Sequence, residues 1–422
     1  MRREIAQVAA ILATVMRTTL LLALPVMLCA QERGALNGHL PSWLNFGVQS
    51  RIRAEGNRAD NFGLYRLRFS ADVRPVKWLE FYGEAQDARS MGFHHPDASV
   101  KDTLDVRQAY VRLGSEDHWW DLKVGRQKIT FGTERVIGAA EWGNTARVFD
   151  AVRLGIHHGP NRVDLFSSSV VNNDPDNRDH HRQGNNLHGV VGSLGSLLAG
   201  ARIEPYLLLR DDHRGNSHSW TAGTRVAGAA RGGWSYEVEA LRQTGAVGSL
   251  KLSAWASTVQ VQRKLARLWW NPSLLGELNY ASGDRNPQDL RVNTFDQLYP
   301  TNHGFYGIAD QVGRRNTRNI RGGVWWRPEK RLTVKTEMHS FWLASRFDGL
   351  YAFNGVLSVP AVASGAVSTD VGRELDVIAD VKLSSHYDIG AQYGHLFPGD
   401  FLRTYSYGAG RGFYAVFLDF RM

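Results

Sequence analysis

The sequence has almost no cysteine and no long apolar segment after its N-terminus. Its only cysteine is Cys29, so a scaffold held together by disulfides is excluded. No apolar run of helix-spanning length follows residue 31, which excludes a helical membrane protein. The net charge of +9 is spread along the chain, without the basic block that nucleic-acid binding requires. We therefore expect no nucleic-acid partner.

The N-terminal segment has the organisation of a signal peptide. Two arginines precede apolar stretches that end at Ala30, before a polar residue. Met16 is an alternative start, because residues 16–30 form a tidier signal by themselves. A lipoprotein acylated at Cys29 is less favoured, because the residue before it is bulky. We expect export and removal of residues 1–30.

The decisive pattern in the rest of the chain is an alternation of apolar and polar residues. One run has its apolar residues at Leu44, Phe46, Val48, Ile52 and Ala54. Successive side chains of a strand point to opposite faces, so each run has one apolar and one charged face. The runs last roughly ten to thirteen residues, which suits a tilted strand that crosses a bilayer. Soluble strands have about five or six residues.

Short and long breaks alternate between these runs. Short turns are expected around residues 75–77, 115–118, 158–161, 328–330 and 384–386. Long polar connections are expected at residues 90–102, 130–147, 172–186, 283–317, 344–371 and 397–411. Those at residues 130–147 and 283–317 are candidates to fold inward as constrictions, with a surface cap as the alternative. In outer-membrane barrels the short turns face the periplasm and the long loops face outside. Weak alternation within residues 187–270 leaves one hairpin more or fewer open.

These patterns predict an all-β fold, a single transmembrane antiparallel β-barrel of about 18 strands with short periplasmic turns and long extracellular loops. We expect the barrel over residues 43–422, after a periplasmic lead-in over residues 31–42. Tryptophan positions agree with this scheme, because most of the 13 tryptophans lie close to an expected periplasmic turn. Amphipathic rings prefer the membrane interface and form girdles there.

Two stretches of the sequence resemble the alginate export family of outer-membrane barrels. One runs through residues 281–284, 293–303 and 307–310, and the other through residues 125–127, 131–132 and 142–150. The residues that carry the resemblance are Arg126, Gln127, Trp142, Asn144, Arg147, Asp150, Asp284, Asp296, His303 and Asp310. The resemblance implies a monomeric 18-stranded barrel with an arginine-lined, anion-selective pore that exports an acidic polysaccharide.

If the apolar faces contact lipid, the charged faces line a lumen. The candidate lining residues are Arg51, Arg53, Arg66, Arg68, Arg112, Lys123, Arg153, Lys335, Glu80 and Glu84. Guanidinium groups pair with carboxylates and keep their charge at physiological pH, so a series of them could pass uronate-like groups. The alternative is that arginines and glutamates in the lumen only compensate one another. Arg51, Arg53, Arg66 and Arg68 are the strongest candidates because they have few acidic neighbours in sequence.

The function that these observations favour is an outer-membrane channel for an anionic or polar oligosaccharide or polysaccharide. The alternatives are a general or sugar-uptake porin, a surface adhesin and an outer-membrane hydrolase. No nucleophile motif supports an enzyme, and we expect none. We expect lipid and lipopolysaccharide as surroundings, and no cofactor. No metal site is predicted: Asp284, Asn286 and Asp289 offer oxygen ligands for calcium, but a plain turn is favoured.

Overall fold

A computed structural model gives the fold of the chain. It describes residues 37–57, 60–92, 96–115, 117–195, 197–198 and 200–422. The signal peptide expected over residues 1–30 and residues 31–36 of the lead-in lie outside the described residues. No helix in the described ranges is long and apolar enough to cross a membrane.

The strands of the sheet follow one another around the barrel in chain order. The first nine are β1 (Leu44–Asn57), β2 (Asn61–Val76), β3 (Leu79–Met91), β4 (Asp102–Gly114), β5 (Trp120–Gln127), β6 (Phe149–His158), β7 (Asn161–Asn172), β8 (His180–Leu194) and β9 (Ala201–Asp212). The remaining barrel strands are β10 (Ser217–Ala230), β11 (Trp234–Val247), β12 (Leu250–Lys264), β13 (Ser273–Ala281), β15 (Thr317–Glu329), β16 (Leu332–Leu343), β19 (Asp370–Lys382), β20 (Tyr387–Pro398) and β21 (Arg411–Arg421). Short elements in the connections are η1 (Arg231–Gly233), β14 (Arg291–Val292), β17 (Leu350–Tyr351), β18 (Leu357–Val359) and α3 (Asp400–Tyr405).

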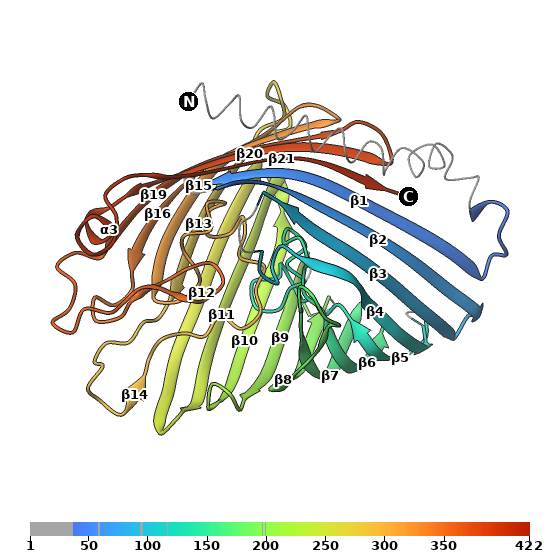
Figure 1. Cartoon of the computed structure of the whole chain (residues 1–422), viewed down its shortest axis with the longest axis horizontal. Coiled ribbons are helices and arrows are strands. Elements are labelled where there is room, and N and C mark those ends of the chain that lie inside the picture. Colours follow the sequence, from blue (N-terminus) through green and yellow to red (C-terminus); the bar gives the residue numbers. More distant parts are fainter. Residues whose placement is uncertain (1–36, 58–59, 93–95, 116, 196, 199) are drawn as a thin grey trace.

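The sheet closes on itself into an antiparallel barrel of 18 strands. The closing contact joins the first and last strands, where Gln49 of β1 lies opposite Arg421 of β21 (Figure 1). Closure leaves no unpaired sheet edge, which a membrane requires. The predicted fold class is confirmed, and the uncertain stretch 187–270 holds four regular hairpin strands besides the end of β8.

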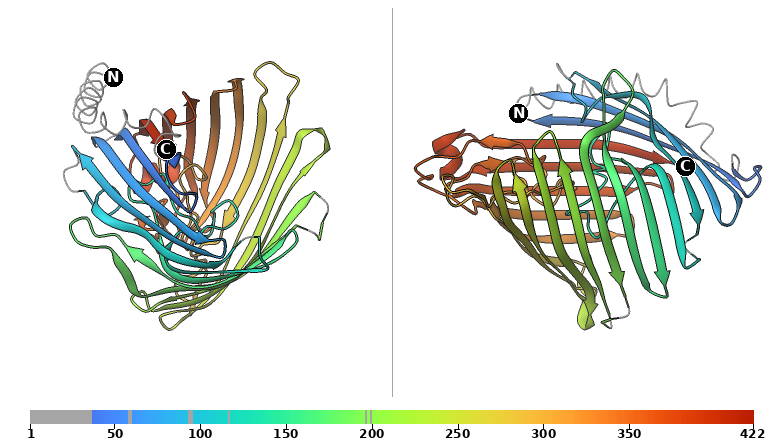
Figure 2. Two further views of the ribbon diagram at one scale, coloured as in Figure 1. Left: turned by 90° about the vertical axis from the view of Figure 1, so that its right-hand side faces the viewer. Right: turned by 90° about the horizontal axis from the view of Figure 1, so that it is seen from below.

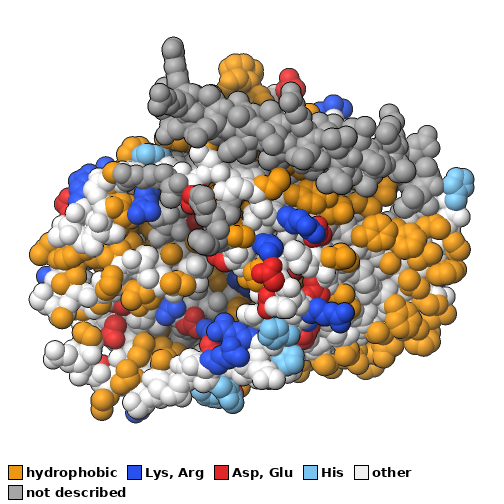
Figure 3. All heavy atoms as spheres, in the orientation of Figure 1, with side chains coloured by type: hydrophobic (Ala, Val, Ile, Leu, Met, Phe, Trp, Pro, Cys, Tyr) orange, Lys and Arg blue, Asp and Glu red, His pale blue; other side chains and the backbone are white. Residues whose placement is uncertain are grey.

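The two faces of each strand differ as the alternation predicts. On β2 the Phe69 side chain is 51% exposed on the outer face, whereas Arg66 and Arg68 are buried on the inner face. Figure 3 shows hydrophobic side chains spread over the outside of the strands and charged side chains around a hollow in the face. The outer surface is therefore suited to lipid.

Aromatic residues mark both rims of this outer surface. Trp78, Trp119 and Trp269, beside the short turns, are exposed. Trp220 and Trp255 lie near the opposite ends of β10 and β12 and are also exposed. From the sequence alone, Trp255 lies near no expected strand end. In the barrel it belongs to the aromatic girdle at the loop end.

Two long loops fold into the barrel, and we name them the first inward loop (residues 128–148) and the second inward loop (residues 282–316). They pair with each other, because Ile137 and Tyr299 form an isolated parallel bridge. The amide of Gly138 donates to the Tyr299 carbonyl at 2.8 Å. Phe295 of the second loop packs in a buried apolar cluster with wall residues such as Phe166. Figure 2 shows the strands curving around these segments.

Candidate functional site

Arginines on the inner face of β1 and β2 hold the first inward loop by its main chain. Arg51 donates to the carbonyl oxygens of Glu141 (3.0 Å), Trp142 (2.9 Å) and Gly143 (3.0 Å). Arg66 donates to the carbonyls of Glu141 (3.2 Å) and Gly143 (3.0 Å). Both arginines are buried. Carbonyl oxygens carry no formal charge, so these bonds engage the terminal guanidinium nitrogens without neutralising the guanidinium charge.

The Glu141 side chain is bound by three cations of the lumen wall and loop. Its carboxylate lies 2.7 Å from Arg68 Nη1, 2.7 Å from Arg107 Nη2 and 2.8 Å from Lys128 Nζ. Burial favours a higher pKa for Glu141, but Arg107, Arg68 and Lys128 hold its pKa well below the ordinary value of 4.5. This group of side chains therefore already binds one carboxylate.

The two inward loops meet at a stack of aromatic rings. The Trp142 and His303 rings are parallel within 2°, with centroids 4.5 Å apart. The Arg53 guanidinium covers the Trp142 ring at 4.1 Å, and it also contacts Glu55 at 2.5 Å. His303 Nδ1 lies 3.0 Å from Asp310. Burial lowers the pKa of His303, but the carboxylate of Asp310 raises it by a larger amount, so the pKa lies above the ordinary value of 6.5. Asp310 thus favours a charged imidazole in the stack.

The candidate cations Arg112 and Arg153 and the candidate carboxylate Glu84 each have a partner of opposite charge on the wall. The pairs are Arg112 with Glu80, Arg107 with Glu84 at 2.5 Å, and Arg153 with Asp164 at 2.8 Å. These pairs fit the alternative in which charges of the lumen compensate one another. Arg51 differs, because its bonded partners are main-chain carbonyls. Arg66 bonds carbonyls too, and its Nη1 also lies 3.9 Å from Glu141 Oε2.

Two candidate lysines contact aromatic rings near the short-turn end. Lys123 Nζ lies 4.3 Å from the centre of the Tyr110 ring, and Lys335 Nζ lies 5.0 Å from that of Trp325. An aromatic face attracts a cation without removing its charge. These lysines stand apart from the arginines of β1 and β2.

A cavity of about 450 Å³ lies beside the arginines of β1 and β2. Its charged lining residues are Arg51, Arg66, Arg68, Lys128, Arg421, Glu84, Glu141 and Asp419. Basic side chains outnumber acidic ones in this lining, so the cavity favours anions. We name this region the basic wall.

Several of the family-motif residues fix the loops rather than face a cavity. Asn144 donates to three main-chain carbonyls, at 2.9, 3.1 and 3.2 Å. Arg147 donates to the carbonyls of Gly138 (3.0 Å) and Tyr299 (2.6 Å), which lie on the two different loops. Burial lowers the pKa of Arg147 to about 10. These side chains tie the two inward loops to each other and to the wall.

Three of the motif residues, which the resemblance led us to expect in loops, lie on strands instead. Arg126 and Gln127 end β5, and Asp150 lies on β6. Arg126 Nε pairs with Asp150 at 2.8 Å. Arg126 is next in the chain to the inward residue Gln127, and Asp150 is next to the inward residue Ala151. Neighbouring side chains of a strand point to opposite faces, so the pair lies on the outer face near the loop end. Gln127 is fully buried and donates to the Ala151 carbonyl.

The two remaining aspartates of the motif have different surroundings. Asp296 pairs with Arg210 of β9. Burial raises the pKa of Asp296, but Arg210 lowers it more, so the carboxylate is ionised. Asp284 accepts a bond from the Asn286 amide at 3.1 Å, and its own amide donates to Asp348 at 2.9 Å. This is the geometry of the plain turn that the sequence favours.

Sequence reasoning missed Arg107 and Lys128 as members of the basic wall. The pairing of β3 with β4 shifts register between Glu84 and Ala85, and Arg107 and Gln108 are both buried. Such a bulge breaks the alternation. Lys128 is the first residue after β5. Alternation from the inward Gln127 would place Lys128 on the outer face, so the strand pattern could not have indicated its position beside the lumen.

Comparison with known proteins gives the family. The alginate export family model matches residues 42–410. No curated protein matches the chain. Acinetobacter baumannii OccAB2 has a similar structure, with TM-score 0.63 and 10% identity over 91% of this chain and 99% of that chain. Pseudomonas aeruginosa OccD3 (OpdP) gives 0.61 and 11% over 91% and 92%, and OccK11 (OpdR) from the same organism gives 0.57 and 11% over 90% and 95%. The chain therefore belongs to the alginate export family of outer-membrane β-barrels.

Proposed function

We propose that this protein is a channel that passes an anionic or polar oligosaccharide or polysaccharide along the basic wall. The mechanism is passive. A hydrated path runs beside the arginines, which pair weakly and repeatedly with passing anions, and the inward loops set the size limit. The barrel contacts the lipid bilayer, and we further propose lipopolysaccharide contacts and a monomeric state. The proposal is for transport and not for catalysis.

The observation that carries the proposal is the binding of the Glu141 carboxylate by Arg68, Arg107 and Lys128. A uronate carries the same group, and forked guanidinium donors suit it. The 450 Å³ cavity next to these cations is large enough for a sugar unit. Since the bonds of Arg51 and Arg66 to carbonyls leave their charge in place, the wall attracts further anions.

A general or sugar-uptake porin is the second candidate. The likeness to the Occ barrels supports it only at the level of the fold, because identity is about a tenth. The two candidates differ in what the basic wall does. A general porin needs no charge preference, whereas the proposed channel depends on one.

Reversal potentials in planar bilayers test the proposal. We expect the wild-type barrel to prefer anions under a salt gradient. Replacing Arg51, Arg53, Arg66 and Arg68 together with glutamine should abolish that preference and also raise conductance, because the first inward loop loses its anchors. Glu141→Gln should increase anion preference, since it removes a bound carboxylate and leaves the cations.

Lys335→Gln is the matched control. It removes one positive charge from the lumen face at the short-turn end, away from the basic wall, and should change the permeability ratio little. Cation preference in the wild type, or a ratio unaffected by the fourfold replacement, would refute the anion path. An unchanged ratio in Glu141→Gln would show that the carboxylate site takes no part in selection.

A further inference from the structure

Four ionisable side chains form a buried block on the inner face of β16 and β19, far from the basic wall. In the strand pairing Glu337 lies opposite Asp376, and His339 lies opposite Glu374. All four are buried, with exposed fractions of 2%, 1%, 0% and 0%. Burial of several carboxylates with one histidine is costly unless a cation balances them.

The nearest fixed cation is already engaged. Arg321 donates to Glu337 Oε2 at 2.9 and 2.6 Å and also lies 3.5 Å from Glu277. Glu337 Oε1 accepts a bond from Trp325 Nε1 at 2.6 Å. Arg321 therefore balances the charge of Glu337 and does not bond the carboxylates of β19.

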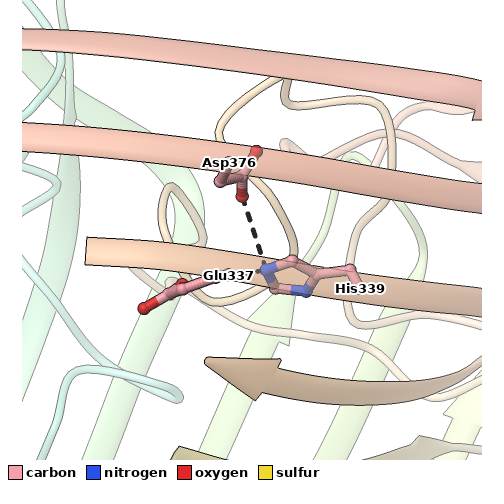
Figure 4. Close-up of side chains that lie close together, drawn as sticks. All are labelled: Glu337, His339 and Asp376. Atoms are coloured by element: carbon pink, nitrogen blue, oxygen red, sulfur yellow. Dashed lines mark ion pairs between the residues drawn. The ribbon is translucent and has the colours of Figure 1, made fainter. Parts of the chain in front are cut away.

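Three polar atoms of the block make no hydrogen bond within the described residues: His339 Nε2, Asp376 Oδ1 and Glu374 Oε2. His339 Nε2 nevertheless lies 3.4 Å from Asp376 Oδ2 and 3.9 Å from Glu337 Oε2. Figure 4 shows His339 of β16 and Asp376 of β19 directed toward each other. The other ring nitrogen, Nδ1, lies 3.4 Å from the amide nitrogen Nδ2 of Asn319. The ring is thus held with Nε2 toward the carboxylates.

The 3.4 Å between His339 Nε2 and Asp376 Oδ2 matches the separation of two atoms that share a metal ion. Nitrogen and oxygen ligands bind Zn²⁺ at about 2.0–2.2 Å, so two ligands of a tetrahedral ion lie about 3.3 Å apart. One ligand atom from each of Glu337, His339 and Asp376 lies within 4.8 Å of the others. An ordinary hydrogen bond would bring the nitrogen and oxygen to about 2.7–3.2 Å. The group is therefore spaced for an ion better than for direct contact.

We propose that Glu337, His339 and Asp376 form a binding site for a divalent transition metal of the Zn²⁺ class, with Glu374 beside it. One imidazole nitrogen with carboxylate oxygens suits such a metal better than calcium, which prefers oxygen ligands alone.

The site has a structural consequence for the second inward loop. The amide of Ala309 donates to Glu374 at 2.7 Å, and that of Ile308 donates to Asp376 at 3.3 Å. A metal that fixes these carboxylates also fixes the loop segment bonded to them. Bound metal should therefore stabilise the inward position of that segment.

Metal content and stability of the refolded full-length barrel test the proposal. After treatment with a chelator, the protein is dialysed against Zn²⁺ and its metal content measured by mass spectrometry. We expect one tightly bound equivalent and a higher melting temperature with Zn²⁺. Co²⁺ should give the intense visible absorption of a tetrahedral site. His339→Gln and Asp376→Asn should each weaken the affinity by at least about a hundredfold, more than loss of a supporting residue does.

His213→Gln is the control for adventitious binding, because His213 is a surface residue with a 71% exposed side chain. It should keep the tight equivalent. Native barrel migration on gels identifies variants that fold. If folded wild type binds no Zn²⁺, or if folded His339→Gln binds it as tightly, the block is only a histidine–carboxylate ion pair with a shared proton and the proposal is wrong.

Discussion

At the scale of single residues, the arginines of the lumen act first on the protein itself. Arg51 and Arg66 hold loop carbonyls, and Arg68 holds the Glu141 carboxylate. The same side chains can attract a solute, because carbonyl bonds leave their charge in place. Loop anchoring and anion attraction are thus two consequences of one cluster, and variants of these arginines should change both.

His303 gives the stack of the two loops a dependence on pH. The pKa of His303 is raised from 6.5 because the attraction of Asp310 outweighs burial. A group whose pKa is higher in the folded state stabilises that state most at a pH below its unfolded-state pKa, here 6.5. This stabilisation is lost as the pH rises through the folded-state pKa. The stabilising effect of His303 should therefore be present in mild acid and absent at alkaline pH.

Melting temperatures of the wild type and His303→Gln across pH measure this effect. We expect the variant to be less stable in mild acid and the two curves to converge at high pH. A difference that grows with rising pH would contradict the assignment of charge to His303.

Residues whose role is local were predictable from the sequence, and those whose role depends on distant partners were not. The inward phase of Arg51, Arg53, Arg66 and Arg68 follows from alternation. Their bonds to residues 141–143 depend on a loop that enters the barrel, which no local pattern encodes. The Glu337 and Asp376 pair was missed for the same reason, although strand order and phase would have placed both on one inner face.

At the scale of elements, the strands follow the physics of a bilayer. Phe69 is half exposed on the outer face near the middle of β2. Phe69→Arg should therefore destabilise the folded barrel by about 2–4 kcal/mol in lipid, the cost of an arginine at the bilayer midplane. Denaturant unfolding in phospholipid vesicles measures the loss.

Ser70→Arg is the matched substitution on the opposite face. Ser70 lines the lumen cavity, so an arginine there contacts water and should be tolerated. Equal destabilisation by the two variants would contradict the assigned faces of β2.

The second inward loop depends on one fully buried ion pair. Arg314 Nη2 lies 2.8 Å from Glu239 of β11, and the two side chains are 0% and 4% exposed. Removing one partner of such a pair costs about 3–5 kcal/mol, because the other charge stays buried. Arg314→Met should therefore release the loop while the strands remain paired.

Limited proteolysis of the refolded protein detects this release. We expect new cleavage within residues 282–316 in Arg314→Met, with barrel migration on gels unchanged. The exposed Arg403 of α3 provides the control, and Arg403→Met should leave the loop protected. Protection equal to that of the wild type in Arg314→Met would show that the pair does not hold the loop.

At the scale of the whole molecule, closure of 18 strands makes a lumen that the two inward loops cross. The first inward loop reaches from Arg68 on β2 to the opposite wall, where Arg135 pairs with Glu277 of β13 at 2.7 Å. Strand number and closure were predictable because period two recurs along the chain. Entry of the two long loops into the lumen was also favoured over a surface cap, because long structured loops in barrels are often functional.

The central claim is that solute passes this obstructed lumen along the basic wall. Flux into proteoliposomes of short oligouronates and of neutral oligosaccharides of equal length tests it most directly. The account predicts faster entry of the oligouronate, with the advantage lost when Arg51, Arg53, Arg66 and Arg68 are replaced together. Equal or faster entry of the neutral sugar, or no flux of either, would contradict it.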